Sequence, residues 1–172
     1  MKAKFFKALI LIPFIIALIS PRILKAQDDM DFEEFMGMVS ETFTDQQLDE
    51  LSYQLPWDIK VTAYGYGDFS GHGLNDFVIA VKQKDITPAG TVDVYFLENI
   101  GDTTYSLVAT HNYKIYDLNI EVAFLVKDGL CYVTNRDKNN WYFTGFQIND
   151  DDSLVQVNRE VFPMDNIEKA GK

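Results

Sequence analysis

One short acidic loop holds the side chains in this sequence that are best suited to binding a metal ion. It lies in the stretch 67-GDFSGHGLNDFVIAVK-82. Calcium takes several hard oxygen ligands, often from alternate positions of one loop that turns sharply at a glycine. In this loop Gly73 stands at the turn, and the alternate positions are Asp68, Ser70, His72, the backbone carbonyl of Leu74, and Asp76. The spacing predicts a calcium-type site with a carboxylate at each end.

The same residues resemble a known repeat. GDFSGHGLNDFVIAV resembles the FG-GAP repeat, also called the VCBS repeat, whose pattern is GDFNGDGxxDLVVA. The resemblance implies a β-propeller blade with calcium in a loop between two strands. A wider resemblance, over residues 57–160, is to small secreted bacterial proteins of unassigned function that carry one such loop. Ser70 replaces the family's Asn and His72 replaces its middle Asp, so we expect weaker calcium binding than the family pattern implies.

Three interpretations of the loop are open at this stage. In the first, it is a degenerate turn, because Asp and Asn cap turns through the backbone and because Gly71 and Gly73 permit positive φ angles. In the second, it binds calcium at millimolar extracellular levels. In the third, His72 holds a transition metal, since imidazole suits zinc or copper. No spacing joins His72 to His111, which lies in a predicted strand.

The rest of the sequence does not predict catalysis. Ser70 and His72 lack the nucleophile-elbow context of a hydrolase. A glycosidase needs a placed pair of carboxylates, and 26 acidic residues nominate no particular pair. No phosphate-binding glycine loop precedes a helix. We therefore predict that the protein is not an enzyme.

Aromatic side chains are the other candidates for ligand contact. Six of them are able to stack on sugar rings or on peptide: Trp57, Tyr64, Tyr66, Tyr116, Trp141 and Tyr142. Packing in the core is the alternative, and large aromatic side chains are usually well buried. We expect Trp57 and Trp141 to lie in the core.

The first 26 residues have the pattern of a secretory signal peptide. A basic start is followed by thirteen largely apolar residues and by a small residue, Ala26, before a polar run. Cleavage after Ala26 leaves Gln27 first. The alternative is an uncleaved anchor, but the apolar run contains Pro13 and falls short of the roughly 20 residues that span a bilayer. We expect an exported protein, periplasmic or extracellular, with no transmembrane segment in its mature chain.

The predicted mature chain is strongly acidic. Residues 1–26 carry five of the 15 basic residues and none of the 26 acidic ones, which leaves a net charge of −16. A field of that sign repels phosphate backbones, so nucleic acid is not an expected partner. A protein or glycan of the cell envelope is compatible with this charge. The lone Cys131 lies in an apolar run and is expected to be buried and inert.

The elements that must position these residues fall into two parts. Residues 27–56 predict one or two short helices, with a capping box at Thr44 and Gln47 and a stop at Pro56. Residues 57–162 predict a β-rich module, and 163–172 a polar tail. Eight runs read as strands separated by turns: 60–66, 76–82, 91–98, 105–113, 120–126, 130–134, 141–148 and 154–160.

These observations predict a mainly β fold. The strands should form an antiparallel meander, either blade-like or a sandwich. The expected function is a non-catalytic binding or scaffold module of the bacterial envelope. Two alternatives are a hydrolase that acts on envelope glycans and one part of a larger β-propeller assembly.

Overall fold

The computed structural model of the protein describes residues 30–101, 103–115 and 122–163. The predicted signal peptide, the tail from residue 164 onward and Tyr116 lie outside these residues. In the described part of the chain, no helix is long and apolar enough to cross a membrane.

Two short helices precede the main strands, as predicted. Helix α2 spans Phe32–Val39 and helix α3 spans Asp45–Gln54. The predicted capping box of α3 is confirmed, because the Gln47 N–H donates to Thr44 Oγ1 and the Thr44 N–H donates to Gln47 Oε1. A short strand before the helices, β1 (Met30–Asp31), was not predicted. Asp31 caps α2 by accepting the Glu34 N–H at 2.9 Å.

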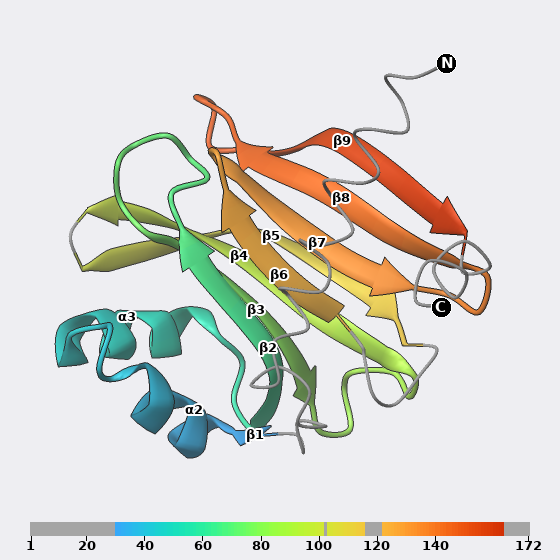
Figure 1. The fold of residues 1–172 in the computed structure, drawn as a ribbon. Coiled ribbons are helices and arrows are strands. Elements are labelled where there is room, and N and C mark those ends of the chain that lie inside the picture. The colour runs from blue at the N-terminus through green and yellow to red at the C-terminus, as the bar shows by residue number, and fades with distance from the viewer. Residues whose placement is uncertain (1–29, 102, 116–121, 164–172) are drawn as a thin grey trace.

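The strands, β1 included, form two antiparallel sheets, so the predicted mainly β meander is confirmed (Figure 1). The five-stranded sheet has the order β1-β2-β3-β4-β5 and the four-stranded sheet has the order β6-β7-β8-β9. The strand bounds are β2 Ile59–Gly67, β3 Asp76–Gln83, β4 Thr91–Gly101, β5 Thr104–Lys114, β6 Val122–Lys127, β7 Leu130–Arg136, β8 Asn140–Ile148 and β9 Leu154–Pro163.

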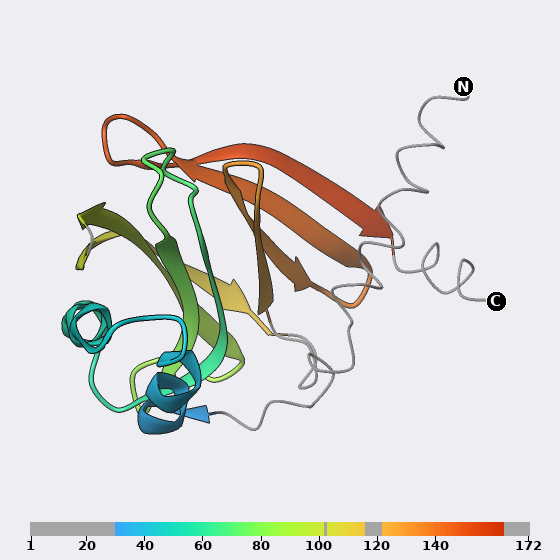
Figure 2. The same cartoon turned by 60° about the vertical axis from the view of Figure 1, so that its left-hand side comes forward.

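The elements stack in three layers. Figure 2 shows the helices on one side of the five-stranded sheet and the four-stranded sheet on its other side. Alternation along the strands explains this arrangement. In β3, Phe77 and Ile79 pack with the helices, whereas Val78 and Ala80 pack with Cys131 and other residues of the second sheet. Strand β3, at the centre of the five-stranded sheet, is therefore buried on both faces, which explains its continuous apolar run.

The two sheets lie closest along the edge where β2 faces β6. Gly65 and Gly67 stand there without side chains, opposite Phe124 and Val126. A Cβ atom at Gly65 would lie 2.9 Å from the Phe124 Cβ, and one at Gly67 would lie 2.7 Å from a Val126 methyl carbon. This edge of the sandwich is closed. The opposite edge, between β5 and β9, is open.

Two predictions about single residues have different outcomes. Cys131 is fully buried, as predicted, and burial raises the pKa of its thiol, so the thiolate is disfavoured. The prediction that Trp57 lies in the core is wrong, because its side chain is 91% exposed. Trp57 sits in the connection between α3 and β2, where its carbonyl accepts a hydrogen bond from Gln83 Nε2. Trp141 is half-buried.

Candidate functional site

The first predicted ligand, Asp68, holds the turn of its own loop. Its Oδ1 accepts the Gly71 N–H at 2.7 Å and its Oδ2 accepts the Gly73 N–H at 3.0 Å. Both glycines have left-handed backbones, with φ angles of +83° and +79°, and a Cβ atom at either would meet nothing within 4 Å. Glycine is therefore favoured here by the backbone conformation and not by lack of space.

The second predicted ligand, Asp76, is completely buried and accepts four hydrogen bonds. Its Oδ2 accepts from the N–H groups of Phe69 (2.8 Å) and Ser70 (2.7 Å). Its Oδ1 accepts from the Asn99 N–H (3.0 Å) and from Ser70 Oγ (3.2 Å). Burial raises the pKa of Asp76 and these hydrogen bonds oppose the rise. One carboxylate thus joins the start of the loop to strand β4.

The loop also reaches the second sheet. The side chain of Phe69 is fully buried among residues of both sheets. Its carbonyl accepts the Ile148 N–H at 3.0 Å, and Ile148 ends strand β8. The residues 68–76 therefore form a connection among β2, β3, β4 and β8, held by carboxylate hydrogen bonds and by one buried ring.

The remaining predicted ligand, His72, lies beside a buried glutamate that the sequence analysis did not single out. His72 Nδ1 is 3.0 Å from Glu98 Oε1, although the pair lacks regular hydrogen-bond geometry. The Glu98 side chain is 1% exposed, while that of His72 is 48% exposed. Burial is the main cause that raises the pKa of Glu98, the charges of Asp152 and Asp76 raise it further, and His72 opposes the rise.

This raised pKa gives a pH-dependent prediction for Glu98→Gln. A carboxyl group whose pKa is raised by folding stabilises the protein below its unfolded pKa, and this stabilisation is lost as the pH rises through the folded pKa. The ionised form of this carboxyl, which a pH of about 8 favours, is poorly solvated in the folded protein. We expect the variant to be about 1 kcal/mol more stable there, because a buried charge without regular hydrogen bonds is removed.

Urea denaturation at several pH values measures this difference. The advantage of Glu98→Gln should be smaller at about pH 5 than at about pH 8, because acid pH favours the protonated wild-type carboxyl, whose pKa burial raises. The exposed Glu41→Gln is the matched control and should change stability by less than about 0.5 kcal/mol at either pH. An advantage for Glu98→Gln that grows toward acid pH would contradict the prediction.

Three of the predicted side-chain ligands, Asp68, Ser70 and Asp76, thus form hydrogen bonds within the protein, and the fourth, His72, lies beside Glu98. In the described ranges, no three His, Cys, Asp or Glu side chains are grouped to hold a metal ion. Asp68 and Asp76 direct their oxygens toward N–H donors, and Ser70 donates to Asp76. These contacts form a hydrogen-bonded turn, the first of the three interpretations of the loop. Calcium binding by this loop stays a prediction, as does a transition metal on His72.

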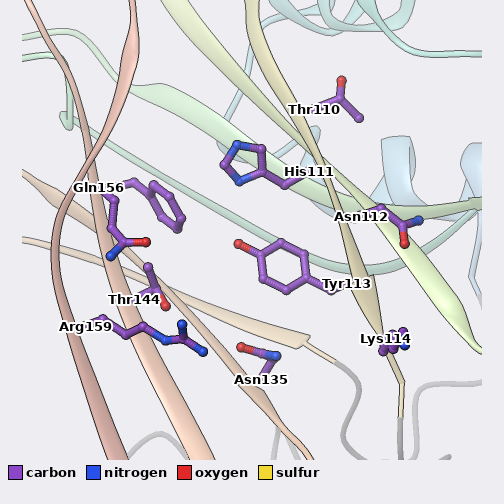
Figure 3. Close-up of a pocket in the computed structure, with 10 residues that line it drawn as sticks. Thr110, His111, Asn112, Tyr113, Lys114, Asn135, Thr144, Gln156 and Arg159 are labelled. Atoms are coloured by element: carbon purple, nitrogen blue, oxygen red, sulfur yellow. The ribbon is translucent and has the colours of Figure 1, made fainter.

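A cleft at the open edge of the sandwich is the second candidate site, and sequence reasoning missed it. The cleft has a volume of about 560 Å³ and lies between β5 and strands β7, β8 and β9 (Figure 3). The described residues that line it are Thr110, His111, Asn112, Tyr113, Lys114, Asn135, Thr144, Phe146, Gln156 and Arg159. In Figure 3, His111 and Tyr113 point from β5 toward the strands that carry Gln156 and Arg159, while Thr110 and Asn112 point away.

The strand register shows how the core changes into this cleft. Cross-strand partners share one face of a sheet, so a pairing row can be followed from β7 to β9. One row runs from Val133 through Thr144 to Arg159. A second runs from Cys131 through Phe146 to Gln156. Both rows begin with a buried apolar residue and end with an exposed polar one. The sequence does contain a signal for the cleft, namely the polar residues of β9 that point inward. Only the strand register reveals which positions these are.

The aromatic groups of the cleft are packed against one another. The His111 ring makes edge contacts with Phe96 and Phe146, at centroid distances of 5.4 and 5.3 Å. Burial lowers the pKa of His111, so the ring is neutral at pH 7 and offers one donor and one acceptor. Burial raises the pKa of Tyr113, and the charge of Arg159 opposes this rise. The Tyr113 hydroxyl therefore stays protonated.

A chain of contacts holds Arg159 at the cleft. Its guanidinium carbon lies 4.7 Å from the centroid of the Tyr142 ring, a cation–π distance. The Tyr142 hydroxyl donates to Asp137 Oδ2 at 2.6 Å, and Asp137 Oδ1 accepts the N–H groups of Asn139 and Asn140. These hydrogen bonds lower the pKa of Asp137. Asp137 thus fixes the tyrosine ring that supports the guanidinium.

Comparison with known proteins assigns no family. No protein-family model matches the chain, and no curated protein matches it. The likeness of the Asp68–Asp76 loop to the FG-GAP repeat therefore rests on the loop residues themselves.

Proposed function

We propose that this protein is an exported, non-catalytic binding or scaffold module of the bacterial envelope. The observation that carries the proposal is the polar cleft at the open edge of a sandwich whose other edge is closed by Gly65 and Gly67. Ligand sites are typically concave, with aromatic walls and a few convergent polar groups. This cleft combines both features.

The Asp68–Asp76 loop supports this module as a structural connection. Its two carboxylates bind backbone N–H groups, and Phe69 anchors it between the sheets. In this proposal the loop keeps the two sheets in register and so preserves the cleft. Calcium, if bound, would make the same loop more rigid.

The chemistry of the cleft favours binding over hydrolysis. None of its ten described lining residues is acidic, whereas a glycosidase acts through a pair of carboxylates. A hydrolase that acts on envelope glycans and a part of a larger β-propeller assembly are the alternative functions. A hydrolase would release glycan fragments, and a part of a larger propeller would form a stable complex with another chain.

The test combines export, binding and turnover. The full chain is expressed in a bacterial host, and the protein recovered from the periplasm or medium is expected to begin at Gln27 by intact-mass measurement. It is then incubated with purified envelope polysaccharides and peptidoglycan sacculi. We expect co-sedimentation with at least one of them, with the length distribution of the glycan unchanged over time.

Three results would contradict the proposal. Glycan fragments that accumulate with time, absent from a protein-free control, would show an enzyme. Retention of the protein in the cytoplasm would show that it is not exported. Failure to bind any envelope polysaccharide, sacculus or purified envelope protein would remove the binding function.

A further inference from the structure

The inner faces of the two sheets change character toward the open edge, and this change points to a ligand. Inward positions of a β-sandwich are normally apolar, because they form the core between the sheets. Here the inward row Val133, Thr144, Arg159 ends on a charge, and the facing row of the other sheet, Val94 to His111, ends on an imidazole. Polar groups from both sheets therefore face one another across the cleft (Figure 3).

The charge in the cleft is positive, although the chain as a whole carries 26 acidic and 15 basic residues. Arg159 is the cation that faces inward, since it pairs with the inward-facing Thr144. Lys114 also borders the cleft, but it pairs with Thr91 and alternates with the inward-facing Tyr113, so its side chain projects to the other face of β5. Among the described residues, no acidic side chain is recorded in an ion pair with Arg159. The cleft thus offers one guanidinium to an anionic group.

The groups around that guanidinium are neutral and capable of hydrogen bonding. Asn135 and Gln156 supply amides, Thr144 and Tyr113 supply hydroxyls, and His111 supplies a neutral imidazole. Phe146 lies at the buried end of the cleft, and the ring of Tyr142 lies under Arg159. Hydroxyl-rich ligands hydrogen-bond to such amides and hydroxyls.

We propose that the cleft binds an acidic saccharide, with the sugar carboxylate on Arg159 and the ring hydroxyls on the neighbouring amides and hydroxyls. This inference rests on the proposed binding function and names its ligand class. A planar guanidinium pairs with a carboxylate through two parallel hydrogen bonds. A phosphate monoester carries a charge of about −1.5 to −2. It is typically held by several cations or by backbone N–H groups at a helix N-terminus. The described residues of this cleft lie on strands and supply Arg159 as the inward-facing cation, which suits the single charge of a carboxylate.

The test is a titration of the isotope-labelled exported protein with D-galacturonate, D-galactose and acetate, followed by amide NMR shifts. We expect galacturonate to bind at least about tenfold more tightly than galactose, since a charge-assisted bidentate pair is lost with the neutral sugar. Shifts should fall on β5, β7, β8 and β9. A galacturonan tetramer distinguishes a free sugar from a chain, and tighter binding of either form supports the proposal.

Variants separate the cleft from other sources of anion attraction. Arg159→Gln should abolish the preference for galacturonate, and Arg159→Lys should retain part of it, because lysine keeps the charge without the planar fork. Lys114→Gln is the matched control, since it removes a cation at the same rim that points away, and it should change affinity less than about twofold. Unchanged amide shifts outside the cleft show that each variant is folded.

Four outcomes would overturn the inference. They are equal binding of galactose and galacturonate, acetate binding as tight as that of galacturonate, full affinity in Arg159→Gln, and no response to any saccharide at about 10 mM, where a site of millimolar affinity would be nearly saturated. If envelope polysaccharide still co-sediments with Arg159→Gln, only the cleft assignment fails. If no envelope component binds the wild type, the proposed function itself fails.

Discussion

Replacement of Asp76 with alanine is expected to lower the free energy of unfolding by about 3–4 kcal/mol, because it removes the acceptor of several buried donors. The substitution leaves the N–H groups of Phe69, Ser70 and Asn99 without their partner. Burial penalises the ionised carboxylate, so part of this loss is offset when the charge is removed. Urea denaturation of the full-length exported protein at neutral pH measures the change.

Two further variants show whether the hydrogen bonds carry this effect. Asp76→Asn keeps the volume, but it turns one acceptor oxygen into an NH₂ group that faces N–H donors, so it should also destabilise by about 2 kcal/mol or more. The exposed Asp49→Ala on helix α3 is the control and should stay within about 0.5 kcal/mol of the wild type. Equal stability of Asp76→Ala and Asp49→Ala would refute the role of the loop as a connection between sheets.

The same measurement in chelator and in millimolar calcium separates a turn from a metal site. If the loop is held by side-chain hydrogen bonds, Asp76→Ala loses the same stability in both solutions, and calcium leaves the wild type unchanged. A calcium-dependent rise of the wild-type midpoint that disappears in Asp68→Ala would instead establish a native-state metal site by mass action. The loop would then bind calcium, as the resemblance to the FG-GAP repeat implies.

Replacement of Gly67 with alanine is the second prediction of a large effect, with an expected loss of about 2–4 kcal/mol. The new Cβ atom would lie 2.7 Å from the Val126 Cγ1, and the backbone φ of Gly67 is +151°, which side chains of L-residues rarely adopt. The overlap occurs where the sheets approach most closely, so we expect the closed edge to be pushed apart. Thermal or urea denaturation measures the loss.

Matched variants divide this loss into its two causes. Gly129→Ala changes a glycine whose φ is +75° but whose surroundings are open, so it reports the cost of a left-handed backbone without a steric overlap, about 1–2 kcal/mol. Adding Val126→Ala to Gly67→Ala removes the obstructing methyl groups. The double variant should therefore lose less stability than the sum of the losses of the two single variants. Simple additivity of Gly67→Ala and Val126→Ala would show that the two sheets are not in contact here.

The two large effects act on the same geometry. Gly67 sets how closely the sheets approach at one edge, and Asp76 fixes the loop that connects β4 with β8. Both features lie away from the lining of the cleft, and both hold the two sheets together. We therefore expect variants at either position to weaken the binding of any ligand to the cleft, because they change the shape of the cleft.

The sequence alone determined the secondary structure well, because strong local signals specify it. Alternating apolar residues separated by Gly, Asn and Asp turns predicted the eight main strands, and Thr44 with Gln47 predicted the start of helix α3. The two-residue strand β1 escaped prediction because Met30 and Asp31 carry no periodic pattern of their own and pair with β2 through the tertiary fold. The burial of Cys131 followed from its apolar neighbours.

The tertiary structure decided what each loop and each polar side chain does. The ligand-like spacing of Asp68 and Asp76 could not show that their oxygens accept N–H donors, one of them from Asn99 on the neighbouring strand β4, 23 residues along the chain. Nor could composition show that Glu98 is buried beside His72, or that Trp57 is exposed. The cleft depends on register: a shift of one residue in β9 would turn Arg159 away from Thr144 and out of the site. Local patterns fix the faces of a strand, but only packing decides which face meets another sheet and which meets a ligand.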